Sequence, residues 1–104
     1  MTTVLLLGLK TSVVADAQEK LGLPDVRILT GYNLDDVRKA LASTKIDHVV
    51  MGAGLDLDTR LAIVQEIYRT TDSTTVHMKD AASGPEGFYP FARGVLTGLD
   101  NRGT

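Results

Sequence analysis

Short apolar runs alternate with longer segments of helical spacing along this chain, and this rhythm restricts the folds open to it. The runs have the length of strands, and the first, Val4 to Gly8, is apolar throughout, as in a strand covered on both faces. Such alternation is typical of βα units, in which helices connect and cover parallel strands. The predicted strands are residues 4–8, 25–30, 46–51 and 74–78.

The helical segments between these strands have recognisable ends. Thr11 or Ser12 is the expected cap of a helix over residues 12–21, and Asn33 is the expected cap of the helix after the second strand. A third helix is predicted over residues 58–69, with an inward apolar stripe. The predicted members of this stripe are Leu61, Val64 and Tyr68, widened by Ile63 and Ile67.

The last helix is expected to begin near Tyr89, with Pro90 in its first turn, where the missing N–H of proline is tolerated. The predicted inward residues are Phe91, Val95 and Leu99. Phe88, Tyr89 and Phe91 bring most of the aromatic residues to one turn. Packing of this helix is the first interpretation of that turn, and a stacking surface or a dimer contact is the alternative.

Together these elements predict one α/β domain over residues 1–104, a Rossmann-like or flavodoxin-like three-layer sandwich around a four-stranded parallel sheet. Right-handed crossovers restrict the topology, and the apolar strands at 4–8 and 46–51 should lie side by side, which gives the strand order 2-1-3-4. In that order the loops after the first and third strands part and leave a crevice. We therefore expect any binding site at the carboxyl ends of the strands.

Charge and composition exclude several classes of function. Eleven Lys and Arg against thirteen Asp and Glu give a net charge of −2, and the basic residues are spread along the chain. Binding to a phosphate backbone needs concentrated positive charge, so we expect no nucleic-acid partner. The chain has no cysteine, which excludes disulfides, thiolate chemistry and cysteine-bound metals.

The opening apolar run, from Val4 to Leu9, is too short for a signal peptide or a membrane span. Lys10, Thr11 and Ser12 follow it directly. We therefore expect a cytoplasmic protein with no membrane partner.

The first candidate site is the turn after the first strand, with Gly8, Lys10, Thr11 and Ser12. Backbone N–H groups at a helix start, two hydroxyls and one ammonium could bind a phosphate or a carboxylate. The spacing matches neither a phosphate loop nor the three-glycine dinucleotide motif. Helix capping and a tight turn also explain these residues.

The second candidate is the end of the third strand, where Gly52 and Gly54 are followed by Asp56 and Asp58. Glycines let a ligand approach the backbone, and carboxylates could bind a hydroxyl, a cation or a ribose. The competing interpretation is that one aspartate caps the third helix and the other is solvated.

The third candidate follows the fourth strand, where acid, base and cation occur together as His77, Lys79, Asp80, Ser83 and Glu86. Strand alternation places His77 and Lys79 on one side, and a histidine beside a carboxylate could act as a general base. A polar face is also common on an edge strand.

His48 opens the third strand, at the end of the sheet where sites of this architecture are rare. We expect it to be a surface residue far from His77, so no shared metal site is predicted.

The order of elements resembles that of phosphorelay receiver domains and of the small cytoplasmic B components of sugar phosphotransferase systems. Lys79 occupies a receiver-like position, but Gly8 and Lys10 replace the acidic pair of receivers, and no aspartate ends the third strand. The turn ending in Lys10, Thr11 and Ser12 resembles the phosphate-cradling turn of the phosphotransferase components, which carry the phosphoryl group on a cysteine that this chain lacks. The resemblance implies a topology, and the chemistry of neither family carries over.

Three functions remain open. The leading hypothesis is the binding of a small anionic ligand, a nucleotide or a phosphorylated metabolite, at the carboxyl ends of the strands. The alternative is a non-catalytic interaction module, a homodimer formed by the last helix or by the fourth strand as an exposed edge. The third is an enzyme with His77 as acid or base and Asp80 or Glu86 as its partner. The sequence indicates no particular cofactor.

Overall fold

The computed structural model describes residues 2–8, 19, 21–52, 54–80 and 87–100. Most of the helix predicted over residues 12–21 lies outside these ranges. None of the helices in the described ranges is long and apolar enough to cross a membrane.

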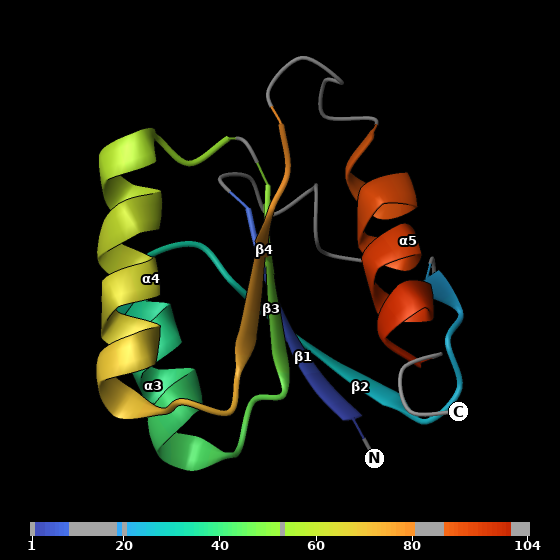
Figure 1. Ribbon diagram of the computed structural model, residues 1–104, viewed down its shortest axis with the longest axis horizontal. Helices are drawn as coiled ribbons and strands as arrows, with labels where there is room; N and C mark the ends of the chain where they lie inside the picture. The colour runs from blue at the N-terminus through green and yellow to red at the C-terminus, as the bar shows by residue number, and fades with distance from the viewer. Residues whose placement is uncertain (1, 9–18, 20, 53, 81–86, 101–104) are drawn as a thin grey trace.

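Four parallel strands form one sheet in the order β2-β1-β3-β4, as predicted (Figure 1). Val4 of β1 lies beside Ile28 of β2 and His48 of β3, so β1 is hydrogen-bonded along both edges. The strands are β1 Thr2–Leu7, β2 Val26–Gly31, β3 His48–Met51 and β4 Thr75–Met78.

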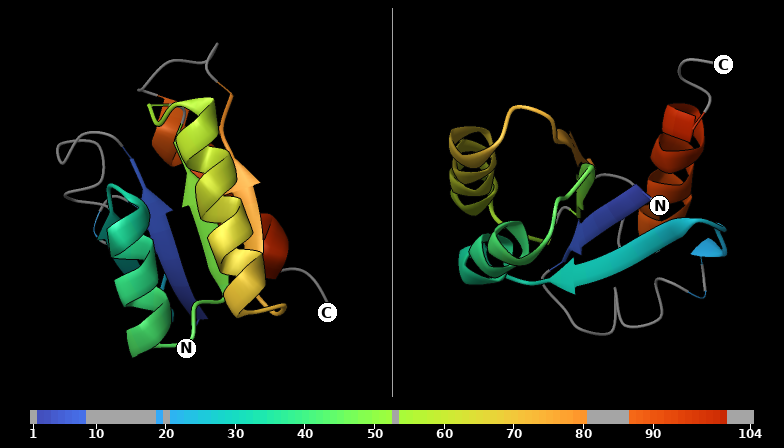
Figure 2. Two further views of the ribbon diagram at one scale, coloured as in Figure 1. Left: turned by 90° about the vertical axis from the view of Figure 1, so that its left-hand side faces the viewer. Right: turned by 90° about the horizontal axis from the view of Figure 1, so that it is seen from below.

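Three described helices cover the sheet in two layers. Two of them, α3 (Leu34–Ser43) and α4 (Leu57–Thr70), lie on one face, and α5 (Phe88–Asp100) lies on the other (Figures 1 and 2). Asn33 caps α3 as predicted, since its Oδ1 accepts a 2.9 Å hydrogen bond from the N–H of Asp36. The result is a three-layer α/β architecture.

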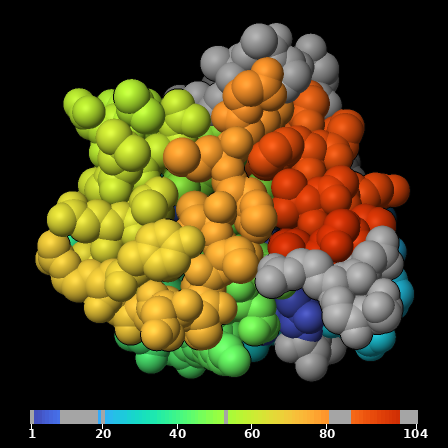
Figure 3. All heavy atoms as spheres, in the orientation of Figure 1, coloured from blue at the N-terminus to red at the C-terminus, as the bar shows by residue number. Residues whose placement is uncertain are grey.

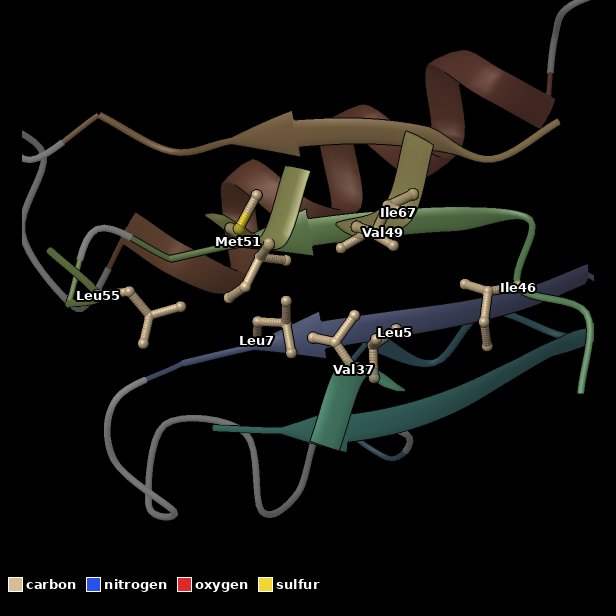
Figure 4. Packing of buried hydrophobic residues seen from close by; sticks show 9 residues of the cluster. Leu5, Leu7, Val37, Ile46, Val49, Met51, Leu55 and Ile67 are labelled. Atoms are coloured by element: carbon tan, nitrogen blue, oxygen red, sulfur yellow. The ribbon is translucent and has the colours of Figure 1, made fainter. Parts of the chain in front are cut away.

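The hydrophobic core consists of two clusters, one on each face of the sheet. Alternate residues of β1 point to opposite faces, so this single strand supplies buried residues to both clusters. On the α3 and α4 side, Leu5 and Leu7 pack toward Val37 of α3 (Figure 4). The buried residues of the α5 side are Val4, Leu6, Leu21, Val26, Val50, Phe88, Ala92 and Leu96.

The predicted inward stripe of α4 is rotated in the structure. Ile63 and Ile67 are fully buried, whereas Leu61 and Tyr68 are about half exposed. Apolar residues occupy a wider arc of this helix than the sheet covers, and packing against α3 decides which part of the arc faces inward. The prediction that Leu61 and Tyr68 face the core is therefore wrong.

The start and proline position of α5 agree with the prediction, but its most buried face differs. Phe88, Ala92 and Leu96 are buried, and the predicted residues are only partly buried beside them. The Phe88 ring packs against Gly52, which directly follows β3, and a Cβ added there would lie 3.4 Å from the ring. This distance is at the close end of ordinary van der Waals contact.

We expect Phe88→Ala to lower the free energy of unfolding by about 3–5 kcal/mol, as for a buried aromatic residue. Phe91→Ala should cost clearly less, because Phe91 is only partly buried. Urea unfolding of both variants measures the difference in the free energy of unfolding. If the alanine variants do not fold, Phe88→Leu and Phe91→Leu give the same comparison. An equal or larger loss at Phe91 would contradict this core arrangement.

Candidate functional site

Three parallel strands end side by side at the carboxyl edge of the sheet. Leu7, Met51 and Met78 lie in register at the ends of β1, β3 and β4. The next residue of each strand continues the same row, which places Gly8, Gly52 and Lys79 on the α5 side. Two residues without side chains therefore lie beside a lysine.

The backbone of this row is already used within the sheet. The N–H of Gly8 donates to the carbonyl of Gly31 at 3.2 Å, and the N–H of Gly52 donates to that of Leu7 at 2.8 Å. These two amides are not available to an anion. Neither glycine can therefore bind an anion through its amide, and the Phe88 ring packs against Gly52.

Lys79 is the most unusual residue of the row. The residue is only 3% exposed, which is rare for a lysine. Its Nζ donates a 2.9 Å hydrogen bond to the backbone carbonyl of Asp80. Among the described residues, no carboxylate forms an ion pair with this ammonium; the ion pair of that part of the chain joins Arg38 to Glu66. Burial of a charged group is costly unless hydrogen bonds and opposite charge compensate it, and the described residues supply Lys79 with one neutral acceptor.

Gly54 and Asp56, the remaining described members of the second candidate site, are exposed. Asp56 is the N-cap of α4, where its Oδ1 accepts a 2.9 Å hydrogen bond from the N–H of Thr59. Hydrogen bonds from Thr59 hold the pKa of Asp56 below its ordinary value of 3.8, with a smaller contribution from the charge of Arg60. Capping therefore accounts for this carboxylate, while Asp58 is exposed in the first turn.

Several predicted site residues lie outside the described residues. They are Lys10, Thr11, Ser12, Ser83 and Glu86. Their roles stay predictions, and the chain order alone places the first three directly after Gly8.

The two histidines lie close together, which corrects the expectation that they are far apart. His48 Nδ1 lies 2.6 Å and His77 Nε2 3.0 Å from the same Thr75 Oγ1. The register explains the proximity: His48 pairs with Thr75 across β3 and β4, and His77 is two residues further on the same face. Strands of four residues are too short to separate their two ends.

This cluster has defined hydrogen-bonding chemistry. The Thr75 hydroxyl carries one proton, so it can donate to one imidazole and accept from the other. Within the described part of the chain, no group of three or more His, Asp or Glu residues could hold a metal ion. Asp80 is exposed, and the acid–base role of His77 stays a prediction.

Sequence reasoning missed Thr75, the residue that joins the two histidines. Alternation along the fourth strand already places Thr75, His77 and Lys79 on one face. The contribution of His48 depends on the register between β3 and β4, for which the sequence carries no signal.

Comparisons of the chain with protein-family models, with curated proteins and with solved structures find no match. The functional argument therefore depends on the residues themselves.

The lowered pKa of Asp56 predicts a specific dependence of stability on pH. A carboxyl group whose pKa is lower in the folded state stabilises the fold above its unfolded-state pKa, and this contribution is lost as the pH falls through the folded-state pKa. Asp56→Asn keeps a capping side chain without the charge. We expect the stability difference between the wild type and Asp56→Asn to shrink between pH 7 and about pH 2 in urea unfolding.

Asp35→Asn is the matched control, because Asp35 lies in the first turn of α3 without capping it. An Asp56→Asn variant with the same acid-induced loss as the wild type would show that the Asp56 charge adds nothing to the cap.

Proposed function

We propose that this protein binds a small anionic ligand, a nucleotide or a phosphorylated metabolite, at the carboxyl edge of the sheet, with Lys79 as the central cation. The observation that carries the proposal is the burial of Lys79, a residue only 3% exposed, at the ends of parallel strands. This edge is where open α/β sheets bind ligands.

Desolvation is the physical reason for expecting an anion. An ammonium loses its hydration when it is buried, and only hydrogen bonds and opposite charge compensate that loss. Lys79 has three N–H donors, and its described hydrogen bond to the Asp80 carbonyl uses one of them. Phosphate oxygens offer both negative charge and acceptors for the remaining donors.

The ends of the neighbouring strands supply the rest of the proposed site. Gly52 follows β3 next to Lys79, and Gly8 follows β1, one strand further along the row. Lys10, Thr11 and Ser12 follow Gly8 in the chain, and the proposal assigns them the second half of the anion site. The amides of Gly8 and Gly52 take no part, since both donate within the sheet.

A thermal-shift titration tests the proposal. Inorganic phosphate, ATP and glucose 6-phosphate are the probes, with chloride at equal ionic strength as the reference. A bound probe at 100 times its Kd adds roughly 2.7 kcal/mol to the free energy of unfolding, which raises Tm on the order of 10 °C in a domain of this size. A protein that none of these probes stabilises over chloride would contradict the proposal.

Lys79→Met supplies the residue-level test, because it removes the ammonium and retains an unbranched apolar side chain. We expect this variant to lose the probe-induced shift while its unliganded stability stays equal or rises, since it removes a buried charge that no carboxylate of the described residues pairs. Lys45→Met is the matched control, because Lys45 is exposed and precedes β3 at the opposite edge of the sheet. An undiminished shift in Lys79→Met would place the anion elsewhere and overturn the assignment of Lys79.

A further inference from the structure

The exposed large apolar side chains of the described residues gather on two neighbouring elements. Leu57, Leu61 and Tyr68 of α4 and Met78 of β4 are 43–57% exposed. α5, which the sequence offered as a dimer contact, has none of them and packs its apolar face on the sheet. A cluster of exposed apolar side chains marks an interaction surface more often than scattered ones do.

The three residues of α4 form one stripe, because their spacings of four and seven residues are close to whole helical turns. Ile63 and Ile67 face the sheet. Glu66 Oε1 lies 3.4 Å from Nε of Arg38 in α3, so the flank of α4 that carries Glu66 faces α3. This flank is opposite the stripe. The stripe therefore faces away from α3, toward the free edge of β4. Figure 3 looks onto this side of the molecule, with α4 in yellow beside β4 in orange.

β4 ends the described sheet, and its backbone alternates between the two edges. The N–H groups of Thr75 and Lys79 donate to the carbonyls of Asp47 and Met51, on the β3 side. By alternation, Val76 and Met78 direct their N–H and C=O groups to the outer edge. Those groups form a template for another strand beside the apolar stripe.

We propose that a second copy of this chain occupies this surface, with β4 pairing antiparallel to β4 and the two α4 stripes in contact. The required symmetry is a two-fold axis perpendicular to the sheet, which keeps both α4 helices on the same face of one continuous sheet. Pairing Val76 of each copy with Met78 of the other uses every outward backbone group of β4. The proposal is independent of the anion site.

Charge complementarity favours a second copy over another partner. α4 carries Asp58 in its first turn and Arg69 in its last turn, and both are exposed. Helical spacing places both of them on the solvent side of the stripe. When two such helices lie antiparallel about a two-fold axis, Asp58 of each copy faces Arg69 of the other. The charged residues at the two ends of α4 therefore complement those of a second copy.

The spacing of the elements also fits. α4 lies over β3 and β4 (Figure 2). Strands are about 4.8 Å apart, so a helix above the gap between these two strands lies about one strand spacing from the proposed axis. The two α4 axes would then be about 10 Å apart, which is the distance of packed helices.

Sedimentation velocity over a range of protein concentrations tests the proposal. We expect the wild type to dimerise and Leu61→Glu, at the centre of the stripe, to weaken the dimer by 100-fold or more. Ala42→Glu is the matched control, because it places the same charge at an exposed position of α3, and it should leave the dimer unchanged. A wild type that stays monomeric throughout, or a dimer that survives Leu61→Glu, would overturn the proposal.

A charge exchange tests the antiparallel orientation without touching the apolar residues. Asp58→Arg creates two repulsive contacts in the dimer and should weaken it about tenfold, and adding Arg69→Asp should restore it. A double variant as weak as the single one would overturn the antiparallel arrangement.

Amide hydrogen exchange reports on strand pairing. The amides of Val76 and Met78 should gain protection with protein concentration, whereas that of His77, which faces β3, should be protected throughout. Concentration-independent exchange at Val76 and Met78 in a dimer would overturn the β4 pairing. Lys79→Met should dimerise as the wild type does, so failure of the anion site and failure of this interface are distinguishable.

Discussion

The burial of β1 on both faces is the constraint on which the rest of the structure depends. Its alternate side chains supply both core clusters, and its two edges bond to β2 and β3. A strand in this position must have helices above and below it, because each apolar face of the sheet needs a cover. The parallel direction of the strands follows from those crossovers, and their register brings the ends of β1, β3 and β4 together in one row.

The residues at the carboxyl edge of the sheet differ in how far the fold explains them. The amides of Gly8 and Gly52 extend the sheet, Gly52 packs against Phe88, and Asp56 caps α4, so each has a structural explanation. The described residues explain Lys79 only in part: burial of a charged side chain costs free energy, and the one acceptor that they supply is a backbone carbonyl. A function at this edge is therefore best sought around the lysine rather than around the glycines.

The two edges of the sheet have different chemistry. The carboxyl edge has buried Lys79 next to Gly52, and it is where we propose an anion site. The free edge along β4 has outward backbone groups beside the exposed apolar stripe of α4, and it is where we propose a dimer interface. Both proposals depend on the position of β4 at the end of the sheet.

The sequence by itself determined the α/β class, the four strands, their order and the cap at Asn33, because periodicity and capping are local and crossover handedness leaves few topologies. It required one aspartate to cap α4, and the structure shows that this is Asp56. The rotation of α4, the choice of Phe88 over Phe91 for the core, and the meeting of His48 with His77 at Thr75 were decided only by the tertiary structure. These features depend on which side chains meet across strands and layers. A one-residue shift in the register of β3 and β4 would separate His48 from Thr75 while leaving every local pattern of the sequence intact.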